Sequence, residues 1–138
     1  MAPVVPVTTN VAFDPAGKPL TVRLAATPAL PGHYSLKLLD ADRFTVIKDY
    51  GNVAFSTPAA NTHDLPGTAA DQVGRILHAV TSVGIVDRDG SFNVSMTVLQ
   101  RGLPLPVAAV DSGTRTQPTA ESELNSFLIK DEAVGGEI

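Results

Sequence analysis

The sequence contains no cysteine and no tryptophan among its 138 residues. The absence of cysteine excludes a disulfide scaffold, cysteine-based zinc sites and thiol chemistry. Two tyrosines and five phenylalanines leave little aromatic surface on which sugars or single-stranded bases could stack. No histidine–cysteine metal motif, phosphate-binding glycine loop or nucleophile elbow is present either. We therefore expect no enzymatic activity, no catalytic residue, no metal and no cofactor.

Long apolar runs are also missing. No stretch approaches the roughly 18 to 20 apolar residues that cross a bilayer, so neither a membrane span nor a membrane partner is expected. The first seven residues lack the basic and apolar regions of a secretory signal. With 43 % hydrophobic residues, the chain is long enough to bury the core of one domain.

The net charge of −4 is distributed unevenly. Five acidic residues but one basic residue lie from residue 121 onward, which leaves residues 1–120 neutral. A neutral body has no broad basic field for neutralising phosphates. The acidic end is typical of a solvated tail.

Alternating apolar and polar residues predict short strands over most of the chain. A strand is predicted at 20–24, a hairpin at 34–47, and further strands at 52–55 and within 107–116. The predicted organisation is a Pro-rich N-terminal extension at 1–30, a β-sheet body at 31–117, a C-terminal helix at 118–131 and a tail at 132–138.

A long central hairpin is predicted between residues 75–87 and 91–100. The second segment alternates throughout, and Asp87-Arg-Asp-Gly90 supplies an Asp-Gly turn signal between the two apolar runs. For Thr68–Val73 the sequence leaves helix and loop open, because Thr68 and Asp71 imitate a capping box while Gly74 and a β-rich run follow.

The segment Thr119–Lys130 predicts a short amphipathic helix. Thr119 is a suitable N-cap, acidic residues occupy the first turn, and Lys130 lies in the last turn. Leu124, Phe127 and Leu128 form an apolar stripe at helical spacing. This stripe is the candidate dimer interface.

Histidines and paired aspartates are candidates for site chemistry, but their pattern is weak. His33, His63 and His78 lie in different segments without ligand spacing, and solvent-exposed positions are expected for His33 and His63. The Asp-x-Asp pairs at 40–42 and 87–89 are interpreted as hairpin turns. The EF-hand glycine and glutamate positions do not match after Asp87, and the pair at 40–42 has no third acidic residue nearby in sequence.

A polar face is predicted on the central hairpin. Ser91, Asn93, Ser95 and Thr97 would point away from the apolar side, next to His78 and Ser82 on the neighbouring strand. Such a face either contacts a ligand or faces water.

From residue 34 onward, the order of elements resembles the coat proteins of small single-stranded RNA bacteriophages. The resemblance includes the segments Gly51-Asn-Val-Ala-Phe and Leu105-Pro-Val-Ala-Ala-Val110, and it covers about 100 residues. It implies an N-terminal hairpin, a meandering antiparallel sheet and a C-terminal helix, interlocked as a homodimer.

The same resemblance implies a structural capsid subunit that self-assembles into an icosahedral shell in the bacterial host cytoplasm. Its sheet would bind single-stranded genomic RNA, including an operator hairpin. The candidate RNA-binding residues are His78, Ser82, Asn93, Ser95, Thr97 and Arg115.

An immunoglobulin-like β-sandwich that serves as a non-catalytic binding or adhesion module is the alternative. Short strands separated by Pro/Gly turns favour it, and residues 20–24 become a regular strand within it. It makes 117–138 a linker, and the sequence lacks the core Trp of a typical sandwich.

Overall fold

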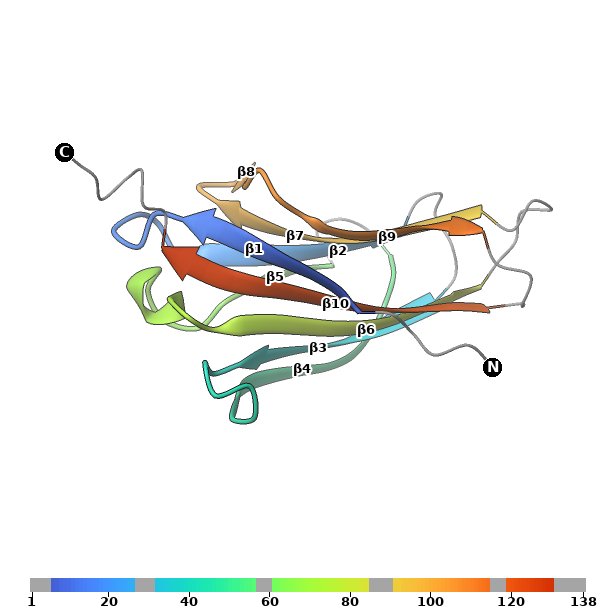
Figure 1. Ribbon diagram of the computed structural model, residues 1–138, viewed down its shortest axis with the longest axis horizontal. Coiled ribbons are helices and arrows are strands. Elements are labelled where there is room, and N and C mark those ends of the chain that lie inside the picture. Colours follow the sequence, from blue (N-terminus) through green and yellow to red (C-terminus); the bar gives the residue numbers. More distant parts are fainter. Residues whose placement is uncertain (1–5, 27–31, 57–60, 85–90, 115–118, 131–138) are drawn as a thin grey trace.

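Two packed β-sheets make up the computed structural model, which describes residues 6–26, 32–56, 61–84, 91–114 and 119–130. The elements are β1 (Val7–Phe13), β2 (Leu20–Ala26), β3 (Gly32–Leu39), β4 (Val46–Ala54), β5 (Thr62–Asp64), the 3-10 helix η1 (Ala70–Gln72), β6 (Ile76–Gly84), β7 (Ser91–Gln100), β8 (Leu103–Pro104), β9 (Ala109–Thr114) and β10 (Thr119–Lys130). Sheet A has the order β1-β10-β6-β3-β4, and sheet B has the order β5-β2-β7-β8 with β9 also paired to β7 (Figure 1).

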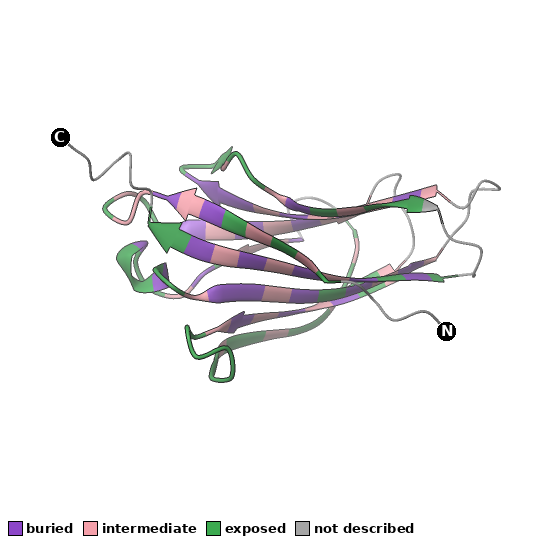
Figure 2. Cartoon of the chain, in the orientation of Figure 1, coloured by how far each residue is buried: buried purple, intermediate pink, exposed green. Residues whose placement is uncertain are grey.

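The strands form because every second side chain can be buried between the sheets. Buried residues alternate with more exposed ones along β2, β3, β6, β7 and β10 (Figure 2). The shared core takes leucines, valines and aromatic residues from both sheets, among them Leu24, Leu36, Val94 and Leu124. The chain is therefore a mainly β protein with two sheets, and the mainly β character that both fold predictions shared is confirmed.

The N-terminal region contributes two strands to this core instead of an irregular extension. β1 pairs in parallel with β10, and β2 pairs antiparallel with β5 and β7. Val11 and Phe13 are buried, as are three residues of the predicted strand at 20–24. The prediction of that strand is confirmed, whereas the description of 1–30 as an extension is wrong for β1 and β2.

The central hairpin prediction is wrong in its pairing. Both strands exist, but β6 lies in sheet A between β10 and β3, and β7 lies in sheet B beside β2 and β9. Each strand has one apolar face, and the two faces pack across the core instead of side by side. The Asp-Gly segment that suggested the hairpin lies outside the described residues.

The C-terminal helix prediction is also wrong, because Thr119–Lys130 forms β10, the longest strand. Its neighbours β1 and β6 pair with it along both edges. Burial follows a period of two, with Ala120, Ser122, Leu124, Ser126 and Leu128 all buried. The helical stripe was a coincidence of three residues, and tertiary pairing overrides it.

The remaining local predictions agree more closely with the structure. The hairpin at 34–47 is confirmed as β3 and β4, although the predicted strand at 52–55 is the continuation of β4 and not a separate element. β9 confirms a strand within 107–116. Between β5 and β6, Thr68 and Asp71 exchange hydrogen bonds of 2.9 and 3.3 Å around the single turn η1.

Candidate interaction surface on sheet A

A row of apolar side chains crosses the outer face of sheet A. In the strand register, Phe127 of β10 lies opposite Ile76 of β6. On the other side of β6, Ile76 lies opposite Leu39 of β3, and Leu39 in turn lies opposite Val46 of β4. All four lie outside the core cluster that the two sheets share. We call these four residues the apolar row.

The β3–β4 turn leans over one end of the apolar row. Arg43 in this turn has a positive φ of 71°, and its guanidinium carbon lies 5.1 Å from the centroid of the Phe127 ring. A Cβ on Gly74 would lie 3.5 Å from that of Ala41, so the turn also approaches the segment that precedes β6. Ile76, which lies between Phe127 and Leu39 in the strand register, is only 5 % exposed although it points away from the core.

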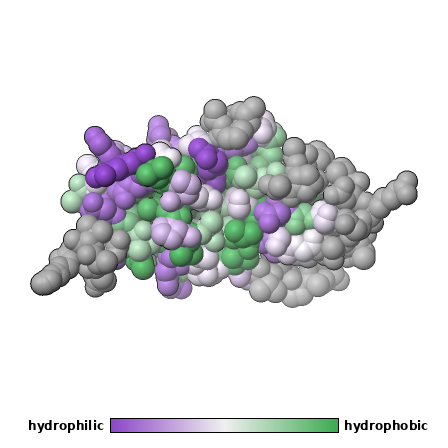
Figure 3. All heavy atoms as spheres, turned by 90° about the horizontal axis from the view of Figure 1, so that it is seen from above, coloured by the Kyte–Doolittle hydropathy of each residue, from purple (hydrophilic) through white to green (hydrophobic). Residues whose placement is uncertain are grey.

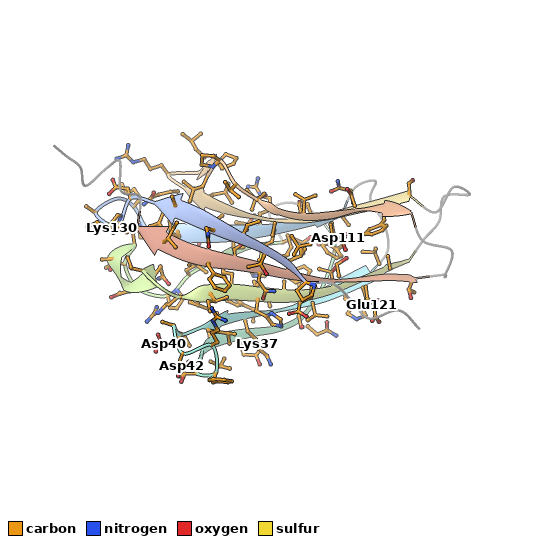
Figure 4. All side chains as sticks on the ribbon, viewed as in Figure 1. Lys37, Asp40, Asp42, Asp111, Glu121 and Lys130 are labelled. Carbon is orange, nitrogen blue, oxygen red and sulfur yellow. The ribbon has the colours of Figure 1, made fainter. Side chains whose placement is uncertain are left out.

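The turn owes its shape to Asp42. Its carboxylate accepts hydrogen bonds from the backbone N–H groups of Phe44 and Thr45, both at 2.8 Å, and from the Thr45 hydroxyl at 2.6 Å. These bonds, led by the one from the hydroxyl, lower the pKa of Asp42. Figure 4 shows Asp40 and Asp42 at this turn, with Lys37 on the adjoining strand. The carboxylate thus holds the turn in place while Phe44 projects from it.

Several apolar side chains in and beside the row are open to solvent. Phe44 is 85 % exposed, Val46 46 % and Ile129 40 %. Ile129 follows Phe127 on the same face of β10. Large apolar groups that gather in this way typically mark an interaction surface.

A polar cluster adjoins the row near the middle of the sheet. His78 Nδ1 lies 2.7 Å from Asn125 Oδ1 and 3.8 Å from Glu123 Oε2, and Asn125 Nδ2 donates to Glu123 at 3.4 Å. Because the Asn125 amide nitrogen faces Glu123, its oxygen accepts from His78, which therefore carries a hydrogen on Nδ1. Lys37 lies opposite His78 in the register, and Asp49 lies opposite Lys37.

The structure does not bring the predicted RNA-binding residues together. His78 and Ser82 lie on the outer face of sheet A, on β6. Asn93, Ser95 and Thr97 lie on the outer face of sheet B, because the residues between them are buried in the core. The expectation of one shared face is wrong, since β6 and β7 belong to different sheets. Arg115 lies outside the described residues.

The predicted dimer interface is divided in a similar way. Leu124 and Leu128 are completely buried in the core of their own chain, so they are not available to a partner. Phe127 points to the opposite face and belongs to the apolar row. The correction follows from the strand period of two, which separates residues that a helix would place together.

The outer face of sheet B is different in character. Small hydroxyl side chains occupy much of β7, and Arg23 Nε donates to Thr62 Oγ1 at 3.0 Å. Exposed apolar residues occur at Leu103 and Val110, on β8 and β9. Figure 3 views the molecule from the side where β8 and β9 lie in Figure 1, and there hydrophobic groups are interspersed with hydrophilic ones.

Sequence reasoning missed a second feature, an inner hydrogen-bonded group beside β5. Tyr34 Oη lies 2.6 Å from His63 Nε2 and accepts from Asn61 Nδ2 at 3.1 Å, while the Tyr50 hydroxyl donates to the Asp64 carbonyl at 2.6 Å. His63 was expected to be exposed in a loop, yet it is half-buried on β5. His33 is exposed as expected, although it lies on β3. A three-residue strand is too short for its alternation to reveal an inward histidine.

Comparison with known proteins adds no identity: no family model, no curated protein and no solved structure matches this chain. Within the described ranges, no helix is long and apolar enough to span a membrane. The same residues contain no group of three or more potential ligands that could hold a metal ion.

Proposed function

We propose that this chain is a non-catalytic β-sandwich module that binds another protein through the apolar row and the β3–β4 turn. The observation that carries the proposal is the exposure of Phe44, Val46 and Ile129, which lie in or beside an apolar row that takes no part in the shared core. Burial of this surface against a partner would remove apolar area from water.

The dimensions of the surface suit a contact with a protein. The apolar row crosses four strands, which at about 4.8 Å between neighbours gives a width of roughly 14 Å. Phe44, in the turn between β3 and β4, is also exposed, and aromatic residues are enriched at the centres of interfaces. Arg43 over Phe127 adds a side chain that is similarly enriched.

The hydrogen bonds of the nucleophilic and basic side chains support binding over catalysis. The Ser122 hydroxyl donates to Asp111 at 2.6 Å and links β10 to β9 across the two sheets. His78 bonds to Asn125, and His63 bonds to the buried Tyr34 hydroxyl. Each of these side chains is hydrogen-bonded to a structural partner within the sandwich.

The coat-protein hypothesis stays a prediction. Two findings weaken its basis: the helix that completed the resemblance is β10, and the candidate RNA-binding residues lie on opposite outer faces. A shell subunit of this fold would use the apolar row against other copies of the chain. The experiment below therefore distinguishes the two hypotheses.

Site-specific photo-crosslinking in the cell that makes the protein tests the proposed surface. A photoreactive phenylalanine analogue at position 44 is expected to trap one defined partner, and Phe127→Ser in the same chain should abolish the adduct. The matched control carries the analogue at Val110, which is 43 % exposed on sheet B.

Equal trapping at both positions, or none at position 44, would contradict the proposal. Adducts between copies of this chain, in particles that contain RNA, would support the coat-protein hypothesis instead.

A further inference from the structure

A continuous set of hydrogen bonds joins the two sheets on the side where β4 and β5 lie. Asn61 is its centre: its side-chain oxygen accepts from the Ser56 N–H at 2.7 Å, and its nitrogen donates to the Ala54 carbonyl at 3.0 Å and to Tyr34 Oη at 3.1 Å. Tyr34 then contacts His63 Nε2 at 2.6 Å. Tyr34 is fully buried and Asn61 is 2 % exposed.

The backbone determines the orientation of the Asn61 amide. A backbone N–H requires the side-chain oxygen, and a backbone carbonyl requires the side-chain nitrogen, so the amide cannot be reversed without losing both bonds. The group that faces Tyr34 Oη is therefore the NH₂ of Asn61.

The orientation of the Asn61 amide determines which atom supplies the hydrogen in the bond between Tyr34 and His63. Tyr34 Oη receives a hydrogen from Asn61, so its own hydrogen points to His63 Nε2. His63 must accept that hydrogen with an unprotonated Nε2. The arrangement therefore requires a neutral imidazole with its hydrogen on Nδ1.

The bond between Tyr34 and His63 holds a small element in place. β5 is a three-residue edge strand of sheet B, paired with β2 through Thr21–Asp64, Val22–His63 and Arg23–Thr62. Its connections to sheet A include the His63–Tyr34 bond and the bond from Tyr50 to the Asp64 carbonyl.

Protonation of His63 would change its Nε2 from a hydrogen-bond acceptor into a donor. Nε2–H would point at a Tyr34 oxygen that already accepts from Asn61, and the tyrosine hydrogen would lose its acceptor in a buried site. We propose that His63 is a pH-sensitive clasp, which holds β5 and Asn61 against sheet A while its ring is neutral and releases them when the ring is protonated.

The groups around His63 support this assignment. Burial lowers the pKa of His63, and the carboxylate of Asp64 acts in the opposite direction. Burial raises the pKa of Tyr34, and it raises the pKa of Tyr50 to about 12 with a contribution from Asp64. Both tyrosines therefore stay neutral where His63 titrates. Lys48 Nζ, on β4, lies 5.7 Å from the centroid of the Tyr50 ring.

Amide hydrogen exchange of the full chain at pH 7.5 and pH 5 tests the clasp. The Leu24 N–H donates to the Asn61 carbonyl at 3.0 Å, and the Leu65 N–H donates to the Leu20 carbonyl at 3.1 Å. After correction for intrinsic rates, both amides are expected to lose about tenfold in protection at pH 5. The Leu128 N–H, bonded to the Arg75 carbonyl at 2.9 Å, is the reference that should not change.

Two variants and one control separate the clasp from general acid destabilisation. His63→Gln should remove the difference between the two pH values, whereas His33→Gln, which changes the exposed histidine, should keep it. Tyr34→Phe removes the donor that favours the neutral ring, so the NMR titration midpoint of His63 should move upward.

Equal protection of Leu24 and Leu65 at both pH values would overturn the proposal. So would a loss of protection that persists in His63→Gln, or a His63 midpoint unchanged by Tyr34→Phe. This inference is independent of the proposed partner-binding surface, and a failed crosslinking experiment would leave it intact.

Discussion

The two faces of sheet A have similar apolar side chains but different surroundings. On the inner face, Leu36, Leu77 and Leu124 are completely buried against sheet B. On the outer face, the apolar row is covered at one end by the β3–β4 turn, and the Val46 side chain remains 46 % exposed. Hydrophobicity alone therefore does not distinguish the core from the outer surface here, because the second sheet decides which face is buried.

The largest expected effect comes from placing a charge on the inner face. Leu124→Asp puts a carboxylate at a site with no exposed area, and we expect a loss of more than about 4 kcal/mol in the free energy of unfolding. Denaturant unfolding followed by circular dichroism measures it. Phe127→Asp, three residues away on the outer face, is the matched variant and should remain folded. A larger loss of stability in Phe127→Asp than in Leu124→Asp would contradict the difference between the two faces of sheet A.

A smaller effect is expected from Phe127→Ala. The ring loses its contacts in the apolar row and its interaction with Arg43, which should cost about 1 to 2 kcal/mol because the side chain is only partly buried. A double-mutant cycle with Arg43→Ala should give a coupling of about 0.5 to 1 kcal/mol. Zero coupling would show that the turn does not stabilise the outer face.

The pH dependence of stability should distinguish an inner histidine from an outer one. The pKa of His63 is lowered in the folded state by burial, so the unfolded chain binds the proton more readily. The neutral His63 ring makes its full contribution to the free energy of unfolding above the ordinary histidine pKa of about 6.5. This contribution falls as the pH decreases from there toward the lower pKa of His63 in the folded state. Unfolding curves at pH 7.5 and 5 should show this loss in the wild type and in His78→Gln, but a reduced loss in His63→Gln. Identical losses in both variants would contradict it.

The smallest effect is expected on the outer face of sheet B. Asn93→Ala combined with Thr97→Ala should change the free energy of unfolding by no more than about 0.5 kcal/mol per site, since both side chains lie on a surface away from the core. Position 44 should crosslink as in the wild type. A loss of that adduct, or of bound RNA, would indicate that the outer face of sheet B is a binding site.

Much of the strand content could be predicted from local alternation. The hairpin at 34–47 and the strands at 20–24, 91–100 and 107–116 follow from patterns that one strand carries by itself. The candidate site could not be predicted in the same way. Its apolar row joins Leu39, Val46, Ile76 and Phe127, whose proximity depends on the pairing of four strands.

The sequence by itself determined the absence of cysteine and tryptophan, the charge distribution and which segments alternate, because each of these is local to the residues concerned. Only the tertiary structure decided that residues 119–130 form a strand, because pairing with both β1 and β6 outweighs a weak helical pattern. The structure also decided that β6 and β7 face each other across the core, and that His63 points to Tyr34. The physical reason is that burial and hydrogen bonding between distant segments depend on neighbours that no local pattern specifies.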